Sequence, residues 1–227
     1  MTPGLALFVK TPGRSPVKSR LWPAIGRKAA EALYLDCAEA GAEVARALQR
    51  AGTLHAYWAV AEAEDDAPPV WRELPRLPQG EGDLGERMAA VYDALLARHG
   101  AALLVGTDVP HLPPEALAEA CDALSSARAD VVLGPSDDGG FWLVGGTRAL
   151  PHSAWTAPRY STPHARADFI AALPTDVCMH LLPTLRDLDE ADDFAPVHAA
   201  LAALPAPTPA QARVLRRLDA LLATMPG

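Results

Sequence analysis

Apolar residues in this chain fall into two patterns that alternate along most of its length. Short apolar runs, bounded by glycine, proline or polar residues, are typical of strands buried on both faces of a sheet. Longer segments repeat apolar residues every three or four positions, as amphipathic helices do. The predicted strands are residues 5–9, 54–60, 102–106, 130–135, 141–146 and 177–183. The predicted helices are residues 27–51 and 83–100, a proline-opened helix within 107–128, one after 187–194, and 209–225.

The alternation of strands and helices predicts an α/β protein with a Rossmann-like, mostly parallel sheet that is covered by helices on both faces. A chain of 227 residues, half of them hydrophobic, can bury one full core, so we expect a single domain. The acidic, proline-rich residues 61–82 interrupt the alternation and predict a loop with room for one short strand.

The charge of the chain narrows the choice of partners. Its net charge is −8, from 20 Lys and Arg against 28 Asp and Glu, which argues against a broad surface for DNA or RNA. The three cysteines, Cys37, Cys121 and Cys178, lie far apart and fit neither a disulfide framework nor a CxxC zinc site. With no signal-peptide pattern and no apolar run of about 18 residues, we expect a soluble, cytoplasmic protein that does not enter membranes.

The stretch FVKTPGRSPVKSRLWP, residues 8–23, follows the first predicted strand. A phosphate-binding P-loop needs two glycines before a lysine and a serine or threonine, so that backbone N–H groups can surround an anion. Taking Lys18 and Ser19 as that pair places Pro12 and Val17 where the glycines belong, so the P-loop interpretation fails. The prolines of this loop lack an N–H, so we expect few backbone donors and no helix directly after it.

Cations remain as the means by which this loop could bind phosphate. Lys10, Lys18 and Arg20 follow the strand, where their side chains would form a phosphate clamp. A second candidate is the segment GEGDLGERM, in which Gly85 and Arg87 lie at the start of a predicted helix, the end that favours anions. The acidic residues of that first turn are also ordinary helix-capping residues.

Acidic residues also follow predicted strands, and ligands of such sheets bind at the carboxyl ends of strands. In GTDVPHLP, Asp108 comes directly after the strand at 102–106. A single aspartate there can cap a turn or helix. Beside a phosphate clamp it can also hold Mg²⁺ or Mn²⁺, because Mg²⁺ commonly takes one or two carboxylates together with phosphate oxygens. We predict Asp108 as the metal ligand.

In SDDGGFWLVGG, two acids precede two glycines between two predicted strands. The residues are Asp137, Asp138, Gly139 and Gly140. A DG or GG pair between strands favours a hairpin turn, although such a turn can also lie at a ligand. One carboxylate could complete a metal site while the other accepts hydrogen bonds from sugar hydroxyls, or one could only cap the turn. Asp138 is favoured over Asp137 for a role in the site.

Further along the chain, DLDEADD at residues 187–193 offers Asp187 or Asp189 as another metal ligand, and capping is an equal explanation. The seven histidines show no HxxxH or HExxH spacing, and no serine occurs in GxSxG. Zinc-hydrolase and α/β-hydrolase functions therefore lack their main residues.

Four motifs in order give the chain a family resemblance: VKTPGRSPVKSRL, GDLGERM, GTDVPHL and GPSDDGGFWLVG. Together they resemble the bacterial glycosyltransferase-A-like proteins known as radical-SAM/selenodomain-associated transferases, some of which are assigned to arsenosugar biosynthesis. The likeness covers most of residues 5–146 and thins beyond them to WTAPRYSTP and DLDEADDF. More distantly, the chain is similar to small nucleotidylyltransferases, including guanylyltransferases, which share a terminal segment like DLDEADD.

The resemblance implies a nucleotide-diphospho-sugar transferase fold, with Lys18 and Arg20 beside the nucleotide phosphates and Asp108 as metal ligand. It also implies that the DGG turn, Asp138–Gly140, lines the sugar or acceptor side, where we expect Asp137 as well. It implies a nucleotide-binding half of about residues 1–110 and an acceptor half of about residues 111–227. The chain departs from the family pattern at Arg14 and Ser15, where proline and glycine are usual, so Arg14 would add a positive charge near the phosphates. The usual DxD motif is also reduced to TDV.

These observations predict an enzyme that binds a nucleotide-diphospho-sugar with Mg²⁺ or Mn²⁺ and transfers the sugar to a small acceptor, mainly by electrostatic stabilisation of the leaving diphosphate. The expected catalytic residues are Asp108, Lys18 and Asp138. One alternative is a guanylyltransferase-like nucleotidylyltransferase that acts on a nucleoside triphosphate and a small phosphorylated acceptor. Another is a catalytically weakened nucleotide-binding module. The amphipathic residues 209–225 leave a homodimer open, and the sequence names neither the donor nor the acceptor.

Overall fold

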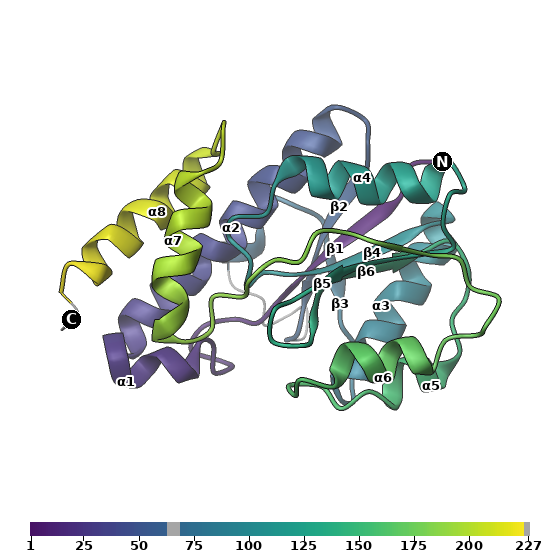
Figure 1. Ribbon diagram of the computed structural model, residues 1–227, viewed down its shortest axis with the longest axis horizontal. Helices are drawn as coiled ribbons and strands as arrows, with labels where there is room; N and C mark the ends of the chain where they lie inside the picture. The colour runs from purple at the N-terminus through teal and green to yellow at the C-terminus, as the bar shows by residue number, and fades with distance from the viewer. Residues whose placement is uncertain (63–68, 225–227) are drawn as a thin grey trace.

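The computed structural model describes residues 1–62 and 69–224. Its centre is a seven-stranded sheet (Figure 1). The strands are β1 (Gly4–Val9), β2 (His55–Val60), β3 (Arg76–Pro78), β4 (Ala102–Gly106), β5 (Val131–Pro135), β6 (Phe141–Gly146) and β7 (Met179–Leu181). Their order across the sheet is β3-β2-β1-β4-β6-β5-β7, and β6 runs antiparallel to its neighbours β4 and β5. The other pairings are parallel, which confirms the predicted mostly parallel α/β sheet.

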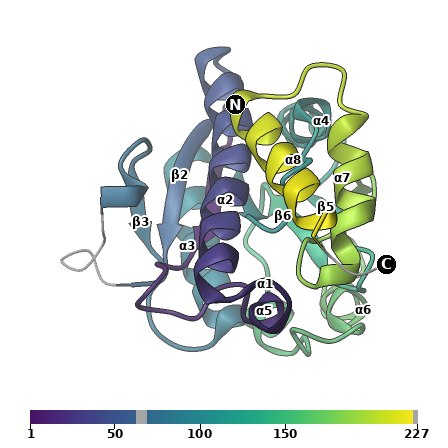
Figure 2. The ribbon, with the colours of Figure 1, turned by 90° about the vertical axis from the view of Figure 1, so that its left-hand side faces the viewer.

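Helices cover both faces of the sheet, as predicted (Figure 2). They are α1 (Trp22–Ile25), α2 (Arg27–Arg50), α3 (Leu84–His99), α4 (Pro114–Ser125), α5 (His152–Thr156), α6 (Ala165–Ala171), α7 (Phe194–Ala202) and α8 (Pro209–Leu222). Helices α2 and α4 lie on one face, and α3, α5 and α6 lie on the other. None of the helices in the described part of the chain is both long and apolar enough to cross a membrane.

Alternate residues of β1 divide the core between the two faces. Leu5 and Leu7 pack toward α2 and α4, whereas Ala6 and the half-buried Phe8 pack toward α3. A third apolar cluster joins the outer side of α2 to α7 and α8. There Asp36 of α2 accepts hydrogen bonds from two arginines of α8 and thereby orients the last helix. The C-terminal helices therefore form an extra layer outside α2 (Figure 2).

The long predicted elements are confirmed, and the differences have local causes. The strand predicted at 177–183 is shorter, and the end of the last predicted helix, Met225, lies outside the described residues. The expectation of no helix after the first loop was wrong, because a 3-10 turn and α1 follow Lys18 directly. Pro23 lies in the first turn of α1, where a missing N–H removes no helical hydrogen bond.

Candidate functional site

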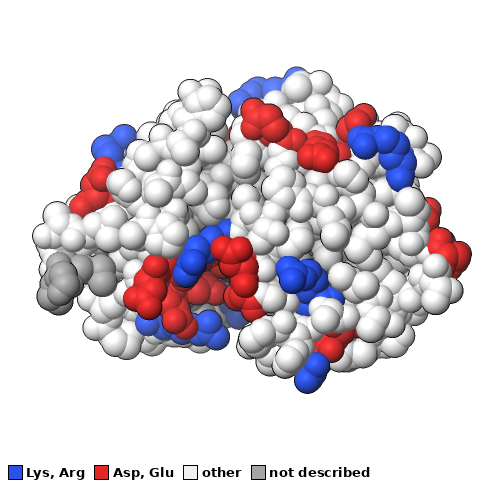
Figure 3. Space-filling view, in the orientation of Figure 1, with Lys and Arg blue, Asp and Glu red and all other residues white. Residues whose placement is uncertain are grey.

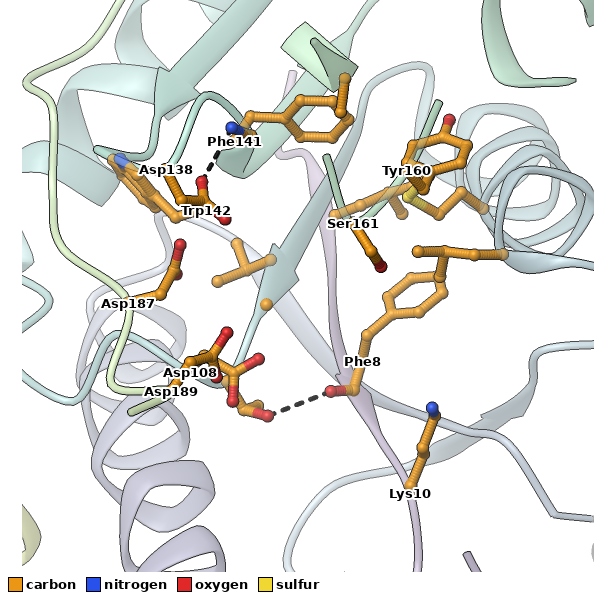
Figure 4. A pocket seen from close by; sticks show the side chains of 18 of the residues that line it. Phe8, Lys10, Asp108, Asp138, Phe141, Trp142, Tyr160, Ser161, Asp187 and Asp189 are labelled. Atoms are coloured by element: carbon orange, nitrogen blue, oxygen red, sulfur yellow. Dashed lines mark hydrogen bonds between the residues drawn. The ribbon is translucent and has the colours of Figure 1, made fainter. Parts of the chain in front are cut away.

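A cavity of about 610 Å³ opens at the carboxyl ends of β1 and β4 (Figure 4). Its walls come from the loop after β1, the start of α3, the start of β6, residues 160–165 and the segment that contains Asp187 and Asp189. The predicted site residues among its lining are Lys10, Lys18, Arg20, Asp108, Asp138 and Gly140. These six come from three of the four sequence motifs, and Leu84 and Met88 of the motif GDLGERM also line the cavity.

The acidic end of the cavity is built by two distant parts of the chain. Asp108 follows β4, and its carbonyl accepts a hydrogen bond from the backbone N–H of Leu188 at 2.8 Å. Leu185, a few residues earlier, pairs with the end of β5. Residues 185–190 thus run beside the ends of β4 and β5 and bring Asp187 and Asp189 to Asp108. Figure 4 shows these three carboxylates on one side of the cavity.

Lys18 holds this acidic end together. Its buried ammonium donates to the Leu188 carbonyl at 2.5 Å and to Asp189 Oδ1 at 3.0 Å, and it forms an ion pair with Asp108. Burial alone would lower the pKa of Lys18, but the charges of Asp108 and Asp189 outweigh burial and raise it. The three ammonium hydrogens thus have three acceptors among these residues, and contact of Lys18 with phosphate stays a prediction.

Asp187 shows how strongly this corner favours a cation. Burial, together with the charges of Asp108, Asp138 and Asp189, raises the pKa of Asp187 to about 7. The residues described here include no group of three or more His, Cys, Asp or Glu side chains spaced to hold a metal ion. Asp108 and Asp187 nevertheless suit Mg²⁺ or Mn²⁺, since Mg²⁺ needs only one or two carboxylates when phosphate oxygens complete its ligands.

The loop after β1 is held by Glu62, a residue the sequence reading did not select. Glu62 accepts hydrogen bonds from the Thr11 backbone N–H at 3.0 Å and from Ser15 Oγ at 2.6 Å. Burial acts in the opposite direction, but these hydrogen bonds lower the pKa of Glu62. The Ser15 hydroxyl therefore ties the loop to Glu62. Arg14 does not line the cavity in the part of the chain that the structure describes.

The two other cations of the loop lie at the cavity. Lys10 lines it, and the backbone N–H of Lys10 donates to the hydroxyl of Tyr34 at 2.8 Å. Arg20 is exposed and lies 3.6 Å from Glu190, a pairing that leaves its guanidinium accessible to solvent. Lys10 and Arg20 are therefore the cations whose side chains are available to an anionic ligand.

The turn between β5 and β6 divides its predicted residues between two places. Asp138 and Gly140 line the cavity, and Asp138 Oδ1 accepts a hydrogen bond from the Gly140 N–H at 2.8 Å. Gly139 has a φ of 87° and packs so closely on the Pro163 carbonyl that a Cβ would lie 2.2 Å from its oxygen. The hairpin turn therefore lies at the cavity, which is one of the two possibilities that the sequence allowed.

Asp137 lies outside the main cavity. It belongs to a second hollow of about 300 Å³, which is lined by Arg20, Asp137, Asp138, Arg186, Asp187, Asp189, Glu190 and Asp193. Figure 3 shows acidic side chains gathered there, with basic side chains among them. The basic side chains partly neutralise the group, since Arg186 donates to Asp193 at 2.8 Å.

Gly85 and Arg87 do not reach the cavity. Gly85 is buried against Trp155, and the Arg87 guanidinium donates to the Gly82 carbonyl at 2.9 Å. Asp83 and Glu86 form a reciprocal capping box at the start of α3, so the acids of this segment cap the helix. The residues of this motif that line the cavity are instead Leu84 and Met88, which are apolar.

Sequence reasoning missed the apolar side of the cavity, formed in part by Phe8, Phe141, Tyr160 and Ser161. The only signal was position, because Phe8 and Phe141 lie at strand ends. Tyr160 and Ser161 occur in a segment without helical or strand periodicity, and a fold is needed to place them beside the other motifs.

The sheet order, the cavity at its carboxyl edge and the acidic corner define an α/β protein with the fold of nucleotide-diphospho-sugar transferases. The chain belongs to the family DUF2064, described as an uncharacterized protein conserved in bacteria, whose sequence profile matches residues 37–162, more than half of its 227 residues. No curated protein matches the chain in sequence. The narrower likeness to radical-SAM-associated and arsenosugar transferases stays a prediction.

Solved structures share the fold. One from Desulfovibrio desulfuricans G20, provisionally assigned as a nucleotide-diphospho-sugar transferase, is 23% identical, with a TM-score of 0.79 over 98% of both chains. A cytidylyltransferase from Leptospira borgpetersenii is 10% identical, with a TM-score of 0.55 over 100% of this chain and 99% of that one. A 4-diphosphocytidyl-2C-methyl-D-erythritol synthase from Anaerococcus prevotii is 10% identical, with a TM-score of 0.50 over 88% and 96%.

Proposed function

We propose that this protein is a transferase that binds a nucleotide-diphospho-sugar together with Mg²⁺ or Mn²⁺ and moves the glycosyl group to a small acceptor. The observation that carries the proposal is the meeting of Asp108 and Asp187 inside a cavity whose loop supplies Lys10 and Arg20. Carboxylates for a hard cation, next to cations for phosphate oxygens, are the groups that a metal-bound diphosphate requires. The fold shared with proteins named as transferases is consistent with this class.

Each residue of the cavity has a defined part in this proposal. Asp108 and Asp187 would hold the cation, which when bound neutralises the negative charge of the departing diphosphate. Lys10 and Arg20 would bind phosphate oxygens. Lys18 positions the acids, because its ammonium joins Asp108 to the 188–189 backbone and side chain. Asp138 would accept a hydrogen bond from a hydroxyl of the sugar or acceptor.

Nucleotidylyl transfer is the second candidate. The observation that favours it is the segment 185–190, whose aspartates face Asp108 in a fold shared with a cytidylyltransferase. In that reaction a phosphorylated acceptor would attack the α-phosphate of a nucleoside triphosphate. The products separate the two reactions, since nucleotidylyl transfer releases pyrophosphate and glycosyl transfer releases a nucleoside diphosphate.

The first test is thermal unfolding with UDP, GDP, CDP and ADP sugars and with the four nucleoside triphosphates, each with and without Mn²⁺. We expect one donor to raise the Tm by about 5–10 °C at a concentration a hundredfold above its Kd, and only with Mn²⁺. Asp108→Asn should remove this shift. Asp122→Asn is the control, because Asp122 is exposed on α4 and pairs with Arg128 away from the cavity.

The same panel can contradict the proposal. A shift of equal size without Mn²⁺, and equal in the Asp108→Asn variant, would fit a nucleotide-binding module without metal-dependent transfer. A shift with a triphosphate but with no nucleotide sugar, followed by pyrophosphate release, would establish nucleotidylyl transfer in its place.

A further inference from the structure

One wall of the cavity lies away from the acidic corner and is lined mainly by rings and small side chains. We call it the far wall, and it consists of Phe141, Tyr160, Ser161, Thr162, Pro163 and Ala165. Figure 4 shows Tyr160 and Ser161 across the cavity from Asp108 and Asp189. In the proposed reaction, the far wall would therefore lie across the cavity from the metal-bound diphosphate. Nothing in the sequence motifs assigned this wall a role.

The rings of the far wall are fixed and present carbon to the cavity. Phe141 packs edge-on against Tyr160, with ring centroids 6.4 Å apart, and against Phe169 at 5.4 Å. The Tyr160 hydroxyl donates to the Trp155 carbonyl at 2.7 Å, away from any ligand. Burial raises the pKa of Tyr160, so this hydroxyl stays neutral. Rings held in this way offer a flat apolar surface to a ligand.

The cations nearest to the far wall are directed elsewhere. The guanidinium of Arg159 binds both carboxylate oxygens of Asp168, at 2.8 and 2.9 Å, and lowers the pKa of Asp168 to about 2. Arg166 donates through its backbone to Gly139 and through its guanidinium to the Ser136 carbonyl. Neither arginine lines the cavity in the described part of the chain.

Within the described residues, the cations that do line the cavity are Lys10, Lys18 and Arg20, all from the loop after β1. In Figure 4, Phe8 lies between Lys10 and the two residues Ser161 and Tyr160. A phosphate or carboxylate placed against the far wall would lose water without meeting a cation, which is unfavourable. The occupant of this wall is therefore expected to be neutral.

Ser161 supplies a polar group in this apolar surface. Its backbone has a φ of 59°, a left-handed conformation that is uncommon for residues other than glycine. Its side chain lines the cavity and makes no hydrogen bond within the described part of the chain. The neighbouring Thr162 hydroxyl, by contrast, donates to the Arg159 carbonyl at 2.7 Å. Ser161 is exposed to solvent, and its hydroxyl is available to a ligand at the cavity.

We propose that the far wall is the acceptor subsite and that it takes a neutral hydroxyl compound with an apolar, ring-shaped body, which packs on Phe141 and Tyr160 and hydrogen-bonds Ser161. The term acceptor rests on the function proposed above, whereas the binding chemistry of the wall does not. A phosphorylated acceptor would find no cation on this wall among the described residues. The proposal therefore favours glycosyl transfer over nucleotidylyl transfer.

The test is ligand-observed NMR on the full chain, without metal or nucleotide. The probes are benzyl alcohol, which carries one ring and one hydroxyl, and benzyl phosphate, which carries the same ring and a negative charge. We expect benzyl alcohol to bind the wild type at least about tenfold more tightly than benzyl phosphate, because the wall offers no cation. Ser161→Ala should weaken the binding of benzyl alcohol about three- to tenfold, as expected for one lost neutral hydrogen bond.

Two further variants separate the hydroxyl from the backbone. Ser161→Gly removes the hydroxyl and also relieves the left-handed conformation, so it should weaken benzyl alcohol as Ser161→Ala does. Ala127→Gly is the matched control, because Ala127 also has a positive φ, 54°, but lies beyond α4 and outside the cavity lining. Its binding of benzyl alcohol should equal that of the wild type.

Three results would overturn the acceptor subsite: no binding of benzyl alcohol, equal or tighter binding of benzyl phosphate, or unchanged binding in both Ser161 variants. None of them depends on a donor. Binding of benzyl alcohol without any metal-dependent nucleotide shift would sink the proposed function and leave the neutral subsite in place. A metal-dependent nucleotide shift without binding of benzyl alcohol would overturn the neutral subsite and leave the proposed function in place.

Discussion

Asp187 lies where burial and the carboxylates of Asp108, Asp138 and Asp189 oppose its ionisation, and its pKa is raised to about 7. In the unfolded chain the same group ionises near pH 4. Between about pH 4 and pH 7, Asp187 is ionised in the unfolded state but still protonated in the folded state. The free energy of unfolding therefore falls as the pH rises through this range. This cost is what a bound cation would remove.

Asp187→Asn should therefore stabilise the metal-free protein at pH 8. We expect its free energy of unfolding, relative to wild type, to rise by on the order of 1–3 kcal/mol between pH 5 and pH 8. Urea unfolding at the two pH values measures this difference. The control is Asp176→Asn, because Asp176 is exposed and a hydrogen bond from Arg148 lowers its pKa, so it titrates below this range. Equal pH profiles for wild type and Asp187→Asn would contradict the raised pKa.

The residues of the site differ in how far the sequence could predict them. Asp108 and Lys10 directly follow apolar strands, so the rule for carboxyl ends was enough to select them. The sequence left two roles for Asp187, helix capping and metal binding. Only its placement beside Asp108 favours metal binding. Ser161 lies in WTAPRYSTP, which carried a family likeness but no assigned role, because a left-handed residue in a segment without periodicity leaves no pattern to interpret.

At the level of elements, the start of α3 shows how a motif can report packing. Gly85 suggested a phosphate-binding turn, but it lies where α3 meets α5. A Cβ on Gly85 would lie 2.0 Å from the Trp155 carbonyl oxygen and 3.1 Å from the ring of Tyr160. Because the first contact is with backbone, the two elements would have to separate to admit even one methyl group.

Gly85→Ala should consequently lower the free energy of unfolding by about 1–3 kcal/mol through overpacking. Gly41→Ala in α2 is the control, and it should raise the free energy of unfolding. Its added Cβ would meet only the flexible Leu7 side chain, at 3.4 Å. Alanine also favours a helix over glycine by up to about 1 kcal/mol. Chemical denaturation of both variants tests the pair. If Gly85→Ala keeps wild-type stability and loses only nucleotide binding, the phosphate role predicted from sequence would be restored.

Elements were predictable in proportion to their length. The 24 residues of α2 and the 16 of α3 span enough turns for a helical period to be visible. Helices α1 and α5, with four and five residues, are too short to show one. The position of β6 between β4 and β5 was also beyond periodicity, because strand order depends on which edges pair after the hairpin forms.

Across the whole molecule, Lys18 joins parts of the chain that are 170 residues apart. It connects the loop after β1 to residues 188–189, which lie beside β4 only through tertiary structure. The outer layer formed by α7 and α8 follows directly from that segment, and Asp36 anchors α8 to α2. The acidic corner is thus fixed both by Lys18 and by the docking of the C-terminal helices.

Removing the Lys18 ammonium should loosen that connection. In Lys18→Met we expect the amide of Leu188, which donates to the Asp108 carbonyl, to exchange with deuterium at least about tenfold faster. Arg20→Met is the matched control, because its exposed pair with Glu190 contributes little and should change exchange by less than about fivefold. Hydrogen exchange read by mass spectrometry distinguishes them. Equal protection in both variants would show that the C-terminal helices alone hold the segment.

The long reach of Lys18 also bears on the biosynthesis of the protein. Chains are made from the N-terminus, and domains generally fold as units. Residues 4–146, which contain β1, β2, β4 and the β5–β6 hairpin, are all translated before residues 187–189. During that interval Lys18 and Asp108 lack their contacts with residues 188–189, and Asp187 is absent, so a ligand that needs both carboxylates cannot be held. Under the proposed function, capture of a metal-bound nucleotide would therefore wait until translation has passed Asp189.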